Sequence, residues 1–275
     1  MMQQKHIRPI KRLGQHFLHH PGLIRQIIQS LKLVPDDVVL EIGFGTGTLT
    51  REVVGRVRDY IGIEIDKGLY EEILTLAGPH ALFLNQDILS LDMALMWQRY
   101  FGAGGRFKVV GNLPYYISSP ILQYLARYSS CLSLAVIMLQ AEVADRVTAA
   151  PSSKSYGLLT LLVQYYFEVK ELFAVSPRAF SPAPRVHSKV LELSSLNTRA
   201  FNSKEETAFF QFVKRAFSHR RKTLLNCLKG HRDYNPLQIE DQLAVMKFPA
   251  NIRAEALSLA DFIALYQKVK KEEVR

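Results

Sequence analysis

The chain has 275 residues, which is enough for one large α/β unit or for a main domain with a small second one. With 48% hydrophobic and 22% charged residues it is not a disordered, fibrous or disulfide-scaffold protein, and its longest apolar run, Leu134 to Leu139, is far too short to span a membrane. Lysine and arginine outnumber aspartate and glutamate by 35 to 25, so a polyanionic partner has to be considered.

The ends and the cysteines add two expectations about location. The N-terminal segment is basic but has no apolar stretch behind it, so we expect no signal peptide. Cys131 and Cys227 lie far apart without His or Cys at ligand spacing, so we expect no structural metal site. A reduced, cytoplasmic location follows.

From residue 35 to about 193, short runs of Val, Ile and Leu alternate with segments of helical spacing, which is typical of βαβ units on a parallel sheet. The pattern predicts strands over 38–42, 60–65, 81–84, 108–110 and 134–139. It predicts helices over 48–57, 67–77, 120–128 and 142–149. Two late strands, 165–173 and 190–196, flank the proline-rich stretch 176–188, which we expect to be irregular.

After residue 196 the apolar residues follow a helical spacing only. We therefore predict two domains. Residues 1–196 form an α/β domain of the Rossmann-like type, with a basic N-terminal arm, and residues 197–275 form a small all-helical domain.

The first predicted strand runs into a glycine-rich turn at Gly43, Gly45 and Gly47, and then into a helix. Glycines permit a tight turn and close approach of a ligand to the backbone. Thr48 stands where a dinucleotide fingerprint has its third glycine, which argues against an NAD enzyme.

Two acidic residues follow the next strands, Glu64 at the end of the second and Asp87 just after the third. Ligands of open α/β sheets bind at these carboxyl ends, where a carboxylate can accept hydrogen bonds from a ribose diol. The alternative is that both acids are merely helix caps. A glycine turn with two acids in this order favours an adenosine ligand without a pyrophosphate, such as S-adenosylmethionine (SAM).

The fourth strand ends at Asn112, followed by Leu113, Pro114 and Tyr115. The exocyclic amine of adenine is a weak nucleophile because its lone pair is delocalised into the ring. The Asn112 side-chain oxygen and a neighbouring backbone carbonyl can hold both amine hydrogens and orient the nitrogen, while proline stiffens the turn and Tyr115 stacks on the base. The alternative is a structural turn with core tyrosines.

Together these motifs resemble the KsgA family of SAM-dependent rRNA adenine dimethyltransferases, which modify two adjacent adenines near the 3′ end of small-subunit rRNA. The resemblance extends almost end to end, over residues 14–18, 41–45, 62–66, 86–87, 112–115, 180–188 and 220–223. It implies a Rossmann-like SAM-dependent methyltransferase sheet with a small all-helical C-terminal domain that binds rRNA.

The resemblance also assigns roles to residues. Catalytic roles fall to Asn112, Leu113, Pro114, Tyr115 and Phe180, and cofactor contacts to His16, Leu18, Gly43, Glu64, Asp87 and Asn112. Phe180 would close the far face of the base; the alternative is a core phenylalanine beside a rigid loop. The family often has Asn where this chain has His16, whose imidazole can still donate one hydrogen bond.

Basic residues are concentrated in three stretches without acids, 1–35, 172–191 and 207–232. Such stretches favour contact with a polyanion, although a charge run can also be a solvated face. With the resemblance, Lys11 and Arg12 before the cofactor segment, and Arg220, Arg221 and Lys222 at the start of a helix, become RNA-binding candidates.

We therefore expect a cytoplasmic, monomeric enzyme that needs SAM and no metal and dimethylates adenine N6 in 16S rRNA within a small ribosomal subunit or its precursor. One alternative is a large-subunit rRNA adenine methyltransferase of the resistance type, against which the segment 220–223 argues. A second alternative is a ribosome-assembly or transcription factor that keeps the fold without catalysis. An NAD enzyme is the third.

Overall fold

The computed structural model describes residues 13–101, 105–229 and 235–270, so Lys11 and Arg12 lie outside the described residues. Close contacts divide the chain into two compact units, one of Met1–Ala144 with Phe167–Leu196 and one of Asp145–Tyr166 with Asn197–Arg275. The first is the α/β unit and the second the helical unit. The segment Asp145–Tyr166 belongs to the helical unit although the linear division predicted it in the first domain.

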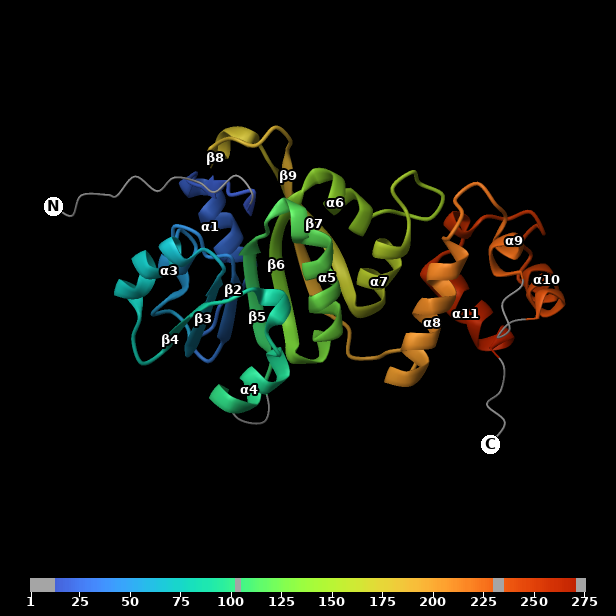
Figure 1. Ribbon diagram of the computed structural model, residues 1–275, viewed down its shortest axis with the longest axis horizontal. Helices are drawn as coiled ribbons and strands as arrows, with labels where there is room; N and C mark the ends of the chain where they lie inside the picture. Colours follow the sequence, from blue (N-terminus) through green and yellow to red (C-terminus); the bar gives the residue numbers. More distant parts are fainter. Residues whose placement is uncertain (1–12, 102–104, 230–234, 271–275) are drawn as a thin grey trace. The chain divides into compact units, whose positions relative to one another are not determined.

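The α/β unit is built on one seven-stranded sheet with the order β4-β3-β2-β5-β6-β9-β7 (Figure 1). The first five of these strands run parallel, whereas β9 is antiparallel to both β6 and β7. The strands are β2 (Val38–Ile42), β3 (Asp59–Glu64), β4 (Ala81–Asn85), β5 (Phe107–Asn112), β6 (Leu132–Gln140), β7 (Phe167–Val175) and β9 (Ser188–Ser195). This confirms the predicted Rossmann-like α/β class.

Helices connect the strands of this sheet. They are α1 (Pro21–Ser30), α2 (Thr50–Val53), α3 (Lys67–Ile73), α4 (Met93–Phe101), α5 (Ser118–Arg127) and α6 (Ala141–Val147), with short 3₁₀ turns η2 (Leu74–Leu76), η3 (Ile88–Ser90), η4 (Tyr115–Ile117), η5 (Ser129–Cys131) and η6 (Pro177–Ala179). The predicted helix over 48–57 is shorter than expected because the glycine turn continues to Leu49 and the chain turns again at Gly55, where φ is +83°.

A separate two-stranded ribbon pairs β1 (Phe17–Leu18) with β8 (Phe180–Ser181) in antiparallel fashion. One of its strands, β8, lies within the proline-rich stretch 176–188 that the sequence predicted to be irregular. The pairing joins the segment before α1 to the segment before β9, and Leu18 and Phe180, which face each other in the register, are both buried.

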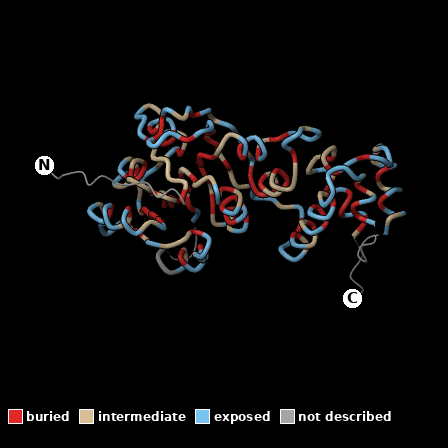
Figure 2. Tube along the Cα trace, turned by 45° about the horizontal axis from the view of Figure 1, so that its top comes forward, coloured by how far each residue is buried: buried red, intermediate tan, exposed pale blue. Residues whose placement is uncertain are grey.

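The helical unit contains α7 (Leu158–Tyr166), α8 (Ser203–Ala216), α9 (Leu224–Leu228), α10 (Pro236–Val245) and α11 (Leu259–Val269), with the turn η7 (Ala254–Ala256). Its interior is aromatic, because Phe209, Phe212, Phe262 and Tyr266 are all buried. Figure 2 shows in red that buried residues recur along the helices of this unit. A capping box formed by Ser258 and Asp261 begins α11. Within the described residues, no helix is long and apolar enough to cross a membrane.

Candidate functional site

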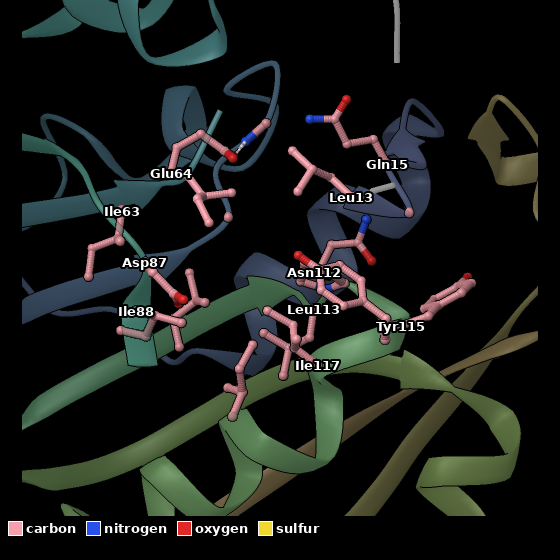
Figure 3. Close-up of a pocket in the computed structure, with 18 of the residues that line it drawn as sticks. Leu13, Gln15, Ile63, Glu64, Asp87, Ile88, Asn112, Leu113, Tyr115 and Ile117 are labelled. Carbon is pink, nitrogen blue, oxygen red and sulfur yellow. Dashed lines mark hydrogen bonds between the residues drawn. The ribbon is translucent and has the colours of Figure 1, made fainter. Parts of the chain in front are cut away.

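A pocket opens at the carboxyl ends of the central strands, where β2 lies between β3 and β5 and the strand order reverses. Open α/β sheets bind their ligands at this position. The empty space in and around it amounts to about 890 Å³, a volume that includes open solvent. Figure 3 shows Glu64, Asp87 and Asn112 lining it from three different strand ends.

The glycine turn forms one wall of the pocket, to which Gly43 and Gly45 contribute. Gly45 has φ of +55°, and its N–H donates a 3.0 Å hydrogen bond to Glu64 Oε2. At Gly47, with φ of +74°, a Cβ atom would lie 2.1 Å from Cδ1 of Ile73. The turn therefore requires glycine for conformation at the first position and for space as well at the second.

Glu64 ends β3 and is 6% exposed. Its two oxygens each accept one backbone hydrogen bond, from the N–H groups of Gly45 and Asp66, both at 3.0 Å. Burial raises the pKa of the carboxyl, against the effect of these two hydrogen bonds. Because a carboxylate offers about four acceptor positions, it can take two more donors from the pocket. The cap of α3 is Asp66, so Glu64 is not the helix cap that the alternative supposed.

Asp87 borders the pocket and also caps a short helical turn. It lines the pocket, and its Oδ1 also accepts a 2.9 Å hydrogen bond from Leu89 N at the start of η3. Gln86 lies beside it in the lining. The cap fixes the side chain at the edge of the pocket, so the functional and structural readings are both compatible with this position.

Asn112 is the last residue of β5, and its side chain is oriented by one contact. Its Nδ2 donates a 2.8 Å hydrogen bond to the backbone carbonyl of His16, which leaves Oδ1 as the acceptor of the amide. His16 is itself held, because its Nδ1 lies 2.7 Å from the carbonyl of Pro182. A backbone carbonyl can only accept, so Nδ1 carries the proton in this contact.

Gln15 is a residue that the sequence analysis did not single out. Its Nε2 donates a 2.8 Å hydrogen bond to Asp66 Oδ2, which joins the pocket lining to the cap of α3. Together with the contacts of His16, this fixes the segment 13–18 along the pocket. The only available signal was its place within the family-like motif at 14–18.

The turn after Asn112 is rigid for several reasons. Leu113 N donates to Met138 O at 3.0 Å, and the carbonyl of Pro114 accepts from Ser118 Oγ at 3.0 Å. Tyr115 lies 2.8 Å from the buried Ser188 through their hydroxyl oxygens, and burial raises the pKa of the phenol. All four residues from Asn112 to Tyr115 line the pocket.

Two predicted site residues lie elsewhere. Phe180 is 3% exposed and belongs to the hydrophobic core rather than to the pocket lining, which agrees with the alternative of a core phenylalanine. Leu18 opposite it is also a core residue; it borders a smaller neighbouring pocket with Gly43 and Asn112. Their apolar side chains are covered by the pairing of β1 with β8, a long-range contact that the sequence analysis did not predict.

Behind the glycine turn is a buried acid that the sequence analysis named only as part of a motif. Glu41 is 1% exposed, and its Oε2 accepts hydrogen bonds from the Tyr60 hydroxyl at 2.6 Å and from Thr50 Oγ1 at 2.8 Å. Burial raises its pKa to about 7. An acid within the otherwise apolar strand 38–42 was the signal that could have found it.

The three basic residues at 220–222 precede α9 instead of beginning it. Thr223 is the helix cap, with its Oγ1 accepting from Asn226 N, so the polar cap and not the basic run sets the helix start. Arg220, Arg221 and Lys222 are all exposed. They lie in the helical unit, whereas the pocket belongs to the α/β unit.

A seven-stranded sheet with this order, and a glycine turn and strand-end acids around one pocket, defines the class of Rossmann-like methyltransferases. A family model described as "Ribosomal RNA adenine dimethylase" matches residues 8–267. The chain therefore belongs to the ribosomal RNA adenine dimethylase family, which confirms the resemblance found in the sequence.

Relatives and solved structures agree with this assignment. The chain is 34% identical over 275 residues to the Ribosomal RNA small subunit methyltransferase A of Alkaliphilus oremlandii, covering 99% of this chain and 96% of the relative. It is 37% identical over 272 residues to the protein of the same name from Streptococcus agalactiae, covering 96% and 93%.

Among solved structures, a dimethyladenosine transferase from Plasmodium falciparum superimposes with a TM-score of 0.74 at 25% identity, covering 92% of this chain and 96% of that one. The 23S rRNA methyltransferase ErmE has a TM-score of 0.71 at 24% identity, covering 92% and 99%, and shows that the fold is shared.

Proposed function

We propose that this SAM-dependent rRNA adenine dimethyltransferase acts on the N6 amines of two adjacent adenines in the 3′-terminal hairpin of 16S rRNA. Family membership supports the reaction, and the small-subunit relatives support the choice of RNA. The observation that carries the proposal is the orientation of Asn112, whose amide nitrogen is committed to His16 and whose oxygen is left as an acceptor at a pocket that also presents Glu64.

The pocket residues fit SAM. Glu64 keeps two acceptor positions, which would take a ribose diol, and Asp87 at the pocket edge would accept from the adenine amine of the cofactor. Ile65 and Ile88 offer apolar surface for a base, and Gly43 has no atom within 4 Å of the position that a Cβ would take. When bound, the cofactor supplies an electrophilic methyl group on a sulfonium sulfur.

Asn112 and the turn after it do the work on the target adenine. The Asn112 oxygen and a backbone carbonyl of the turn hold the amine hydrogens, so the nitrogen lone pair is released from the ring and directed outward. The bonds of Leu113 and Pro114 keep these acceptors fixed during the reaction. Tyr115, held by Ser188, offers a stacking surface for the base.

In this proposal only the target base enters the pocket, and the backbone of the substrate RNA is bound outside it. Exposed cations of the helical unit, Arg221 and Lys222 among them, would contact backbone phosphates, which position an RNA without reading its sequence. Lys11 and Arg12 are candidates for the same role on the arm. The pocket would recognise the base, and RNA shape would select the site. We further propose that the protein acts as a monomer, in the cytoplasm, and without a metal ion.

The experiment is to map methylated adenines in rRNA from cells that lack the protein. The proposal predicts that two adjacent adenines near the 3′ end of the small-subunit rRNA lose their dimethylation, and that the wild-type gene restores it. Loss of a methyl group from large-subunit rRNA would support the resistance-type alternative. Unchanged methylation with defective subunits would identify a non-catalytic assembly factor.

A further inference from the structure

Three segments of the helical unit contain basic residues and no acid, namely 146–166, 207–232 and 242–254. The sequence analysis recognised the second of these and did not consider the other two. They are separated along the chain by 40 residues and by nine residues, so their common character does not arise from one local charge run. A surface that meets a polyanion excludes acids in this way.

Arg220 joins the first two of these segments. Its Nη2 donates a hydrogen bond to the backbone carbonyl of Lys154, in the loop between α6 and α7, and its Nε lies 3.6 Å from the carboxylate of Glu255. Ser152 N donates a 2.7 Å hydrogen bond to the backbone carbonyl of Glu255. The loop 150–156, the loop 217–223 and the turn η7 are therefore linked at Arg220.

These contacts separate Arg220 from its two neighbours. The guanidinium of Arg220 bonds within the protein and is compensated by Glu255, whereas the side chains of Arg221, Lys222 and Lys154 are exposed. No hydrogen bond or ion pair of these three side chains is found within the described residues. The loops 150–156 and 217–223, which Arg220 connects, therefore carry three exposed cations that no acid in the described part of the chain neutralises.

We propose that Lys154 contacts an RNA phosphate on the same surface as Arg221 and Lys222, and that Arg220 is a positioning residue that holds the two loops together. The proposal rests on the proposed function and adds an RNA contact from a segment far away in the sequence. The partner is the sugar-phosphate backbone of the rRNA, because three exposed cations, none of them paired with an acid within the described residues, match its repeated negative charge.

The first test measures affinity for small ribosomal subunits that lack the adenine methylation, as a function of salt concentration. Lys154→Gln is expected to flatten the slope of log affinity against log salt by about 0.7–0.9, the value for one lost phosphate contact. The matched control is Lys268→Gln, because Lys268 is an exposed lysine of α11 in the same unit. Equal slopes for Lys154→Gln and wild type would overturn the assignment of Lys154.

The second test separates positioning from charge. Glu255→Gln removes a negative charge near the surface, so a purely electrostatic surface predicts tighter RNA binding. If Arg220 positions the loops through Glu255, the same variant binds RNA about two- to threefold more weakly, the range of a partly exposed ion pair. Tighter binding would overturn the positioning role. A Glu240→Gln control, at an exposed acid on α10, reports the effect of charge alone.

Measurements on the wild-type protein distinguish a failure of this proposal from a failure of the proposed function. If wild-type protein neither binds nor methylates the unmethylated subunits, the proposed function fails. If wild-type protein does both, and Lys154→Gln keeps the wild-type salt slope, only the present proposal fails. Circular dichroism and SAM affinity of each variant confirm that the fold and the pocket are intact.

Discussion

The side-chain nitrogen of Asn112 and the backbone carbonyl of His16 are joined by a hydrogen bond of 2.8 Å, although the two residues are 96 positions apart. The bond connects the turn at the end of β5 to the segment 13–17 that borders the same pocket. It also determines which way the amide faces, because a carbonyl can only accept. The same contact thus orients the proposed acceptor of the adenine amine and helps to hold the pocket edge.

Replacing Glu64 tests the cofactor site. Glu64→Ala is expected to weaken SAM binding by tenfold or more, because charge-assisted hydrogen bonds contribute about 1.5–3 kcal/mol. Since burial raises the pKa of Glu64 and only its charged form accepts fully, wild-type affinity should fall on acidification sooner than for an ordinary glutamate. Calorimetry measures both effects, with Glu72→Ala on the exposed side of α3 as the control. Unchanged affinity in a folded Glu64→Ala protein would remove the residue from the site.

The buried Glu41 predicts how stability depends on pH. Its pKa is raised from 4.5 to about 7, so the folded state binds a proton that the unfolded state has lost, and stability falls as pH rises through this range. Glu41→Gln keeps an acceptor for Tyr60 and Thr50 without the charge. Above pH 8 the variant should be more stable than wild type by on the order of 3 kcal/mol, and the difference should vanish near pH 4.

Trp97, the single tryptophan, lies in α4 and packs edge-on against Phe107 at 4.6 Å, so its fluorescence reports unfolding of the α/β unit. Urea titrations at several pH values give the comparison between Glu41→Gln and wild type. Parallel pH profiles for the two proteins would show that Glu41 does not carry this dependence.

Alanine substitutions at two glycines distinguish the cost of backbone strain from the cost of a steric collision. Gly55 has φ of +83° with no atom within 4 Å of a Cβ, so Gly55→Ala should cost only about 1–2 kcal/mol of strain. Gly47→Ala adds a collision with Ile73 at 2.1 Å and should cost a further 1–3 kcal/mol or so. Urea unfolding followed at Trp97 measures both. Equal losses would mean that Ile73 moves aside freely.

The basic loop before α9 predicts a salt effect that is specific to RNA. Neutralising Arg221 and Lys222 together should flatten the slope of log affinity for small subunits against log salt by up to about 1.4–1.8, while SAM affinity stays constant. Filter binding over a range of salt concentrations provides the slope. A slope equal to that of wild type would mean that these residues form a solvated face.

Local patterns were enough to predict the sheet, and their failures have physical causes. The five parallel strands were predicted to within two residues at each end, because each is a short apolar run followed by a turn. The predicted strand from 165 instead begins at Phe167, because Tyr165 and Tyr166 complete α7. Apolar residues occupy most of α7, so periodicity alone does not distinguish this helix from a strand.

The candidate site divides in the same way. Glu64, Asp87 and Asn112 were predictable because each follows or ends its own strand, and parallel strands end at one edge of the sheet. The sequence offered two interpretations of Phe180 and could not decide between them, and it did not predict the bond from Gln15 to Asp66, because both depend on contacts between segments far apart in the chain.

The most direct test of the central claim is methyl transfer by the purified protein. Small ribosomal subunits lacking the modification are incubated with SAM, and the methylated positions are located by mass spectrometry. We expect two adjacent N6,N6-dimethyladenines near the 3′ end of the 16S rRNA. Asn112→Ala should lower the single-turnover rate at saturating SAM and RNA by on the order of 10²–10³, as for other preorganised polar groups. Methylation of large-subunit RNA instead, or a folded Asn112→Ala protein that dimethylates at the wild-type rate, would contradict the account.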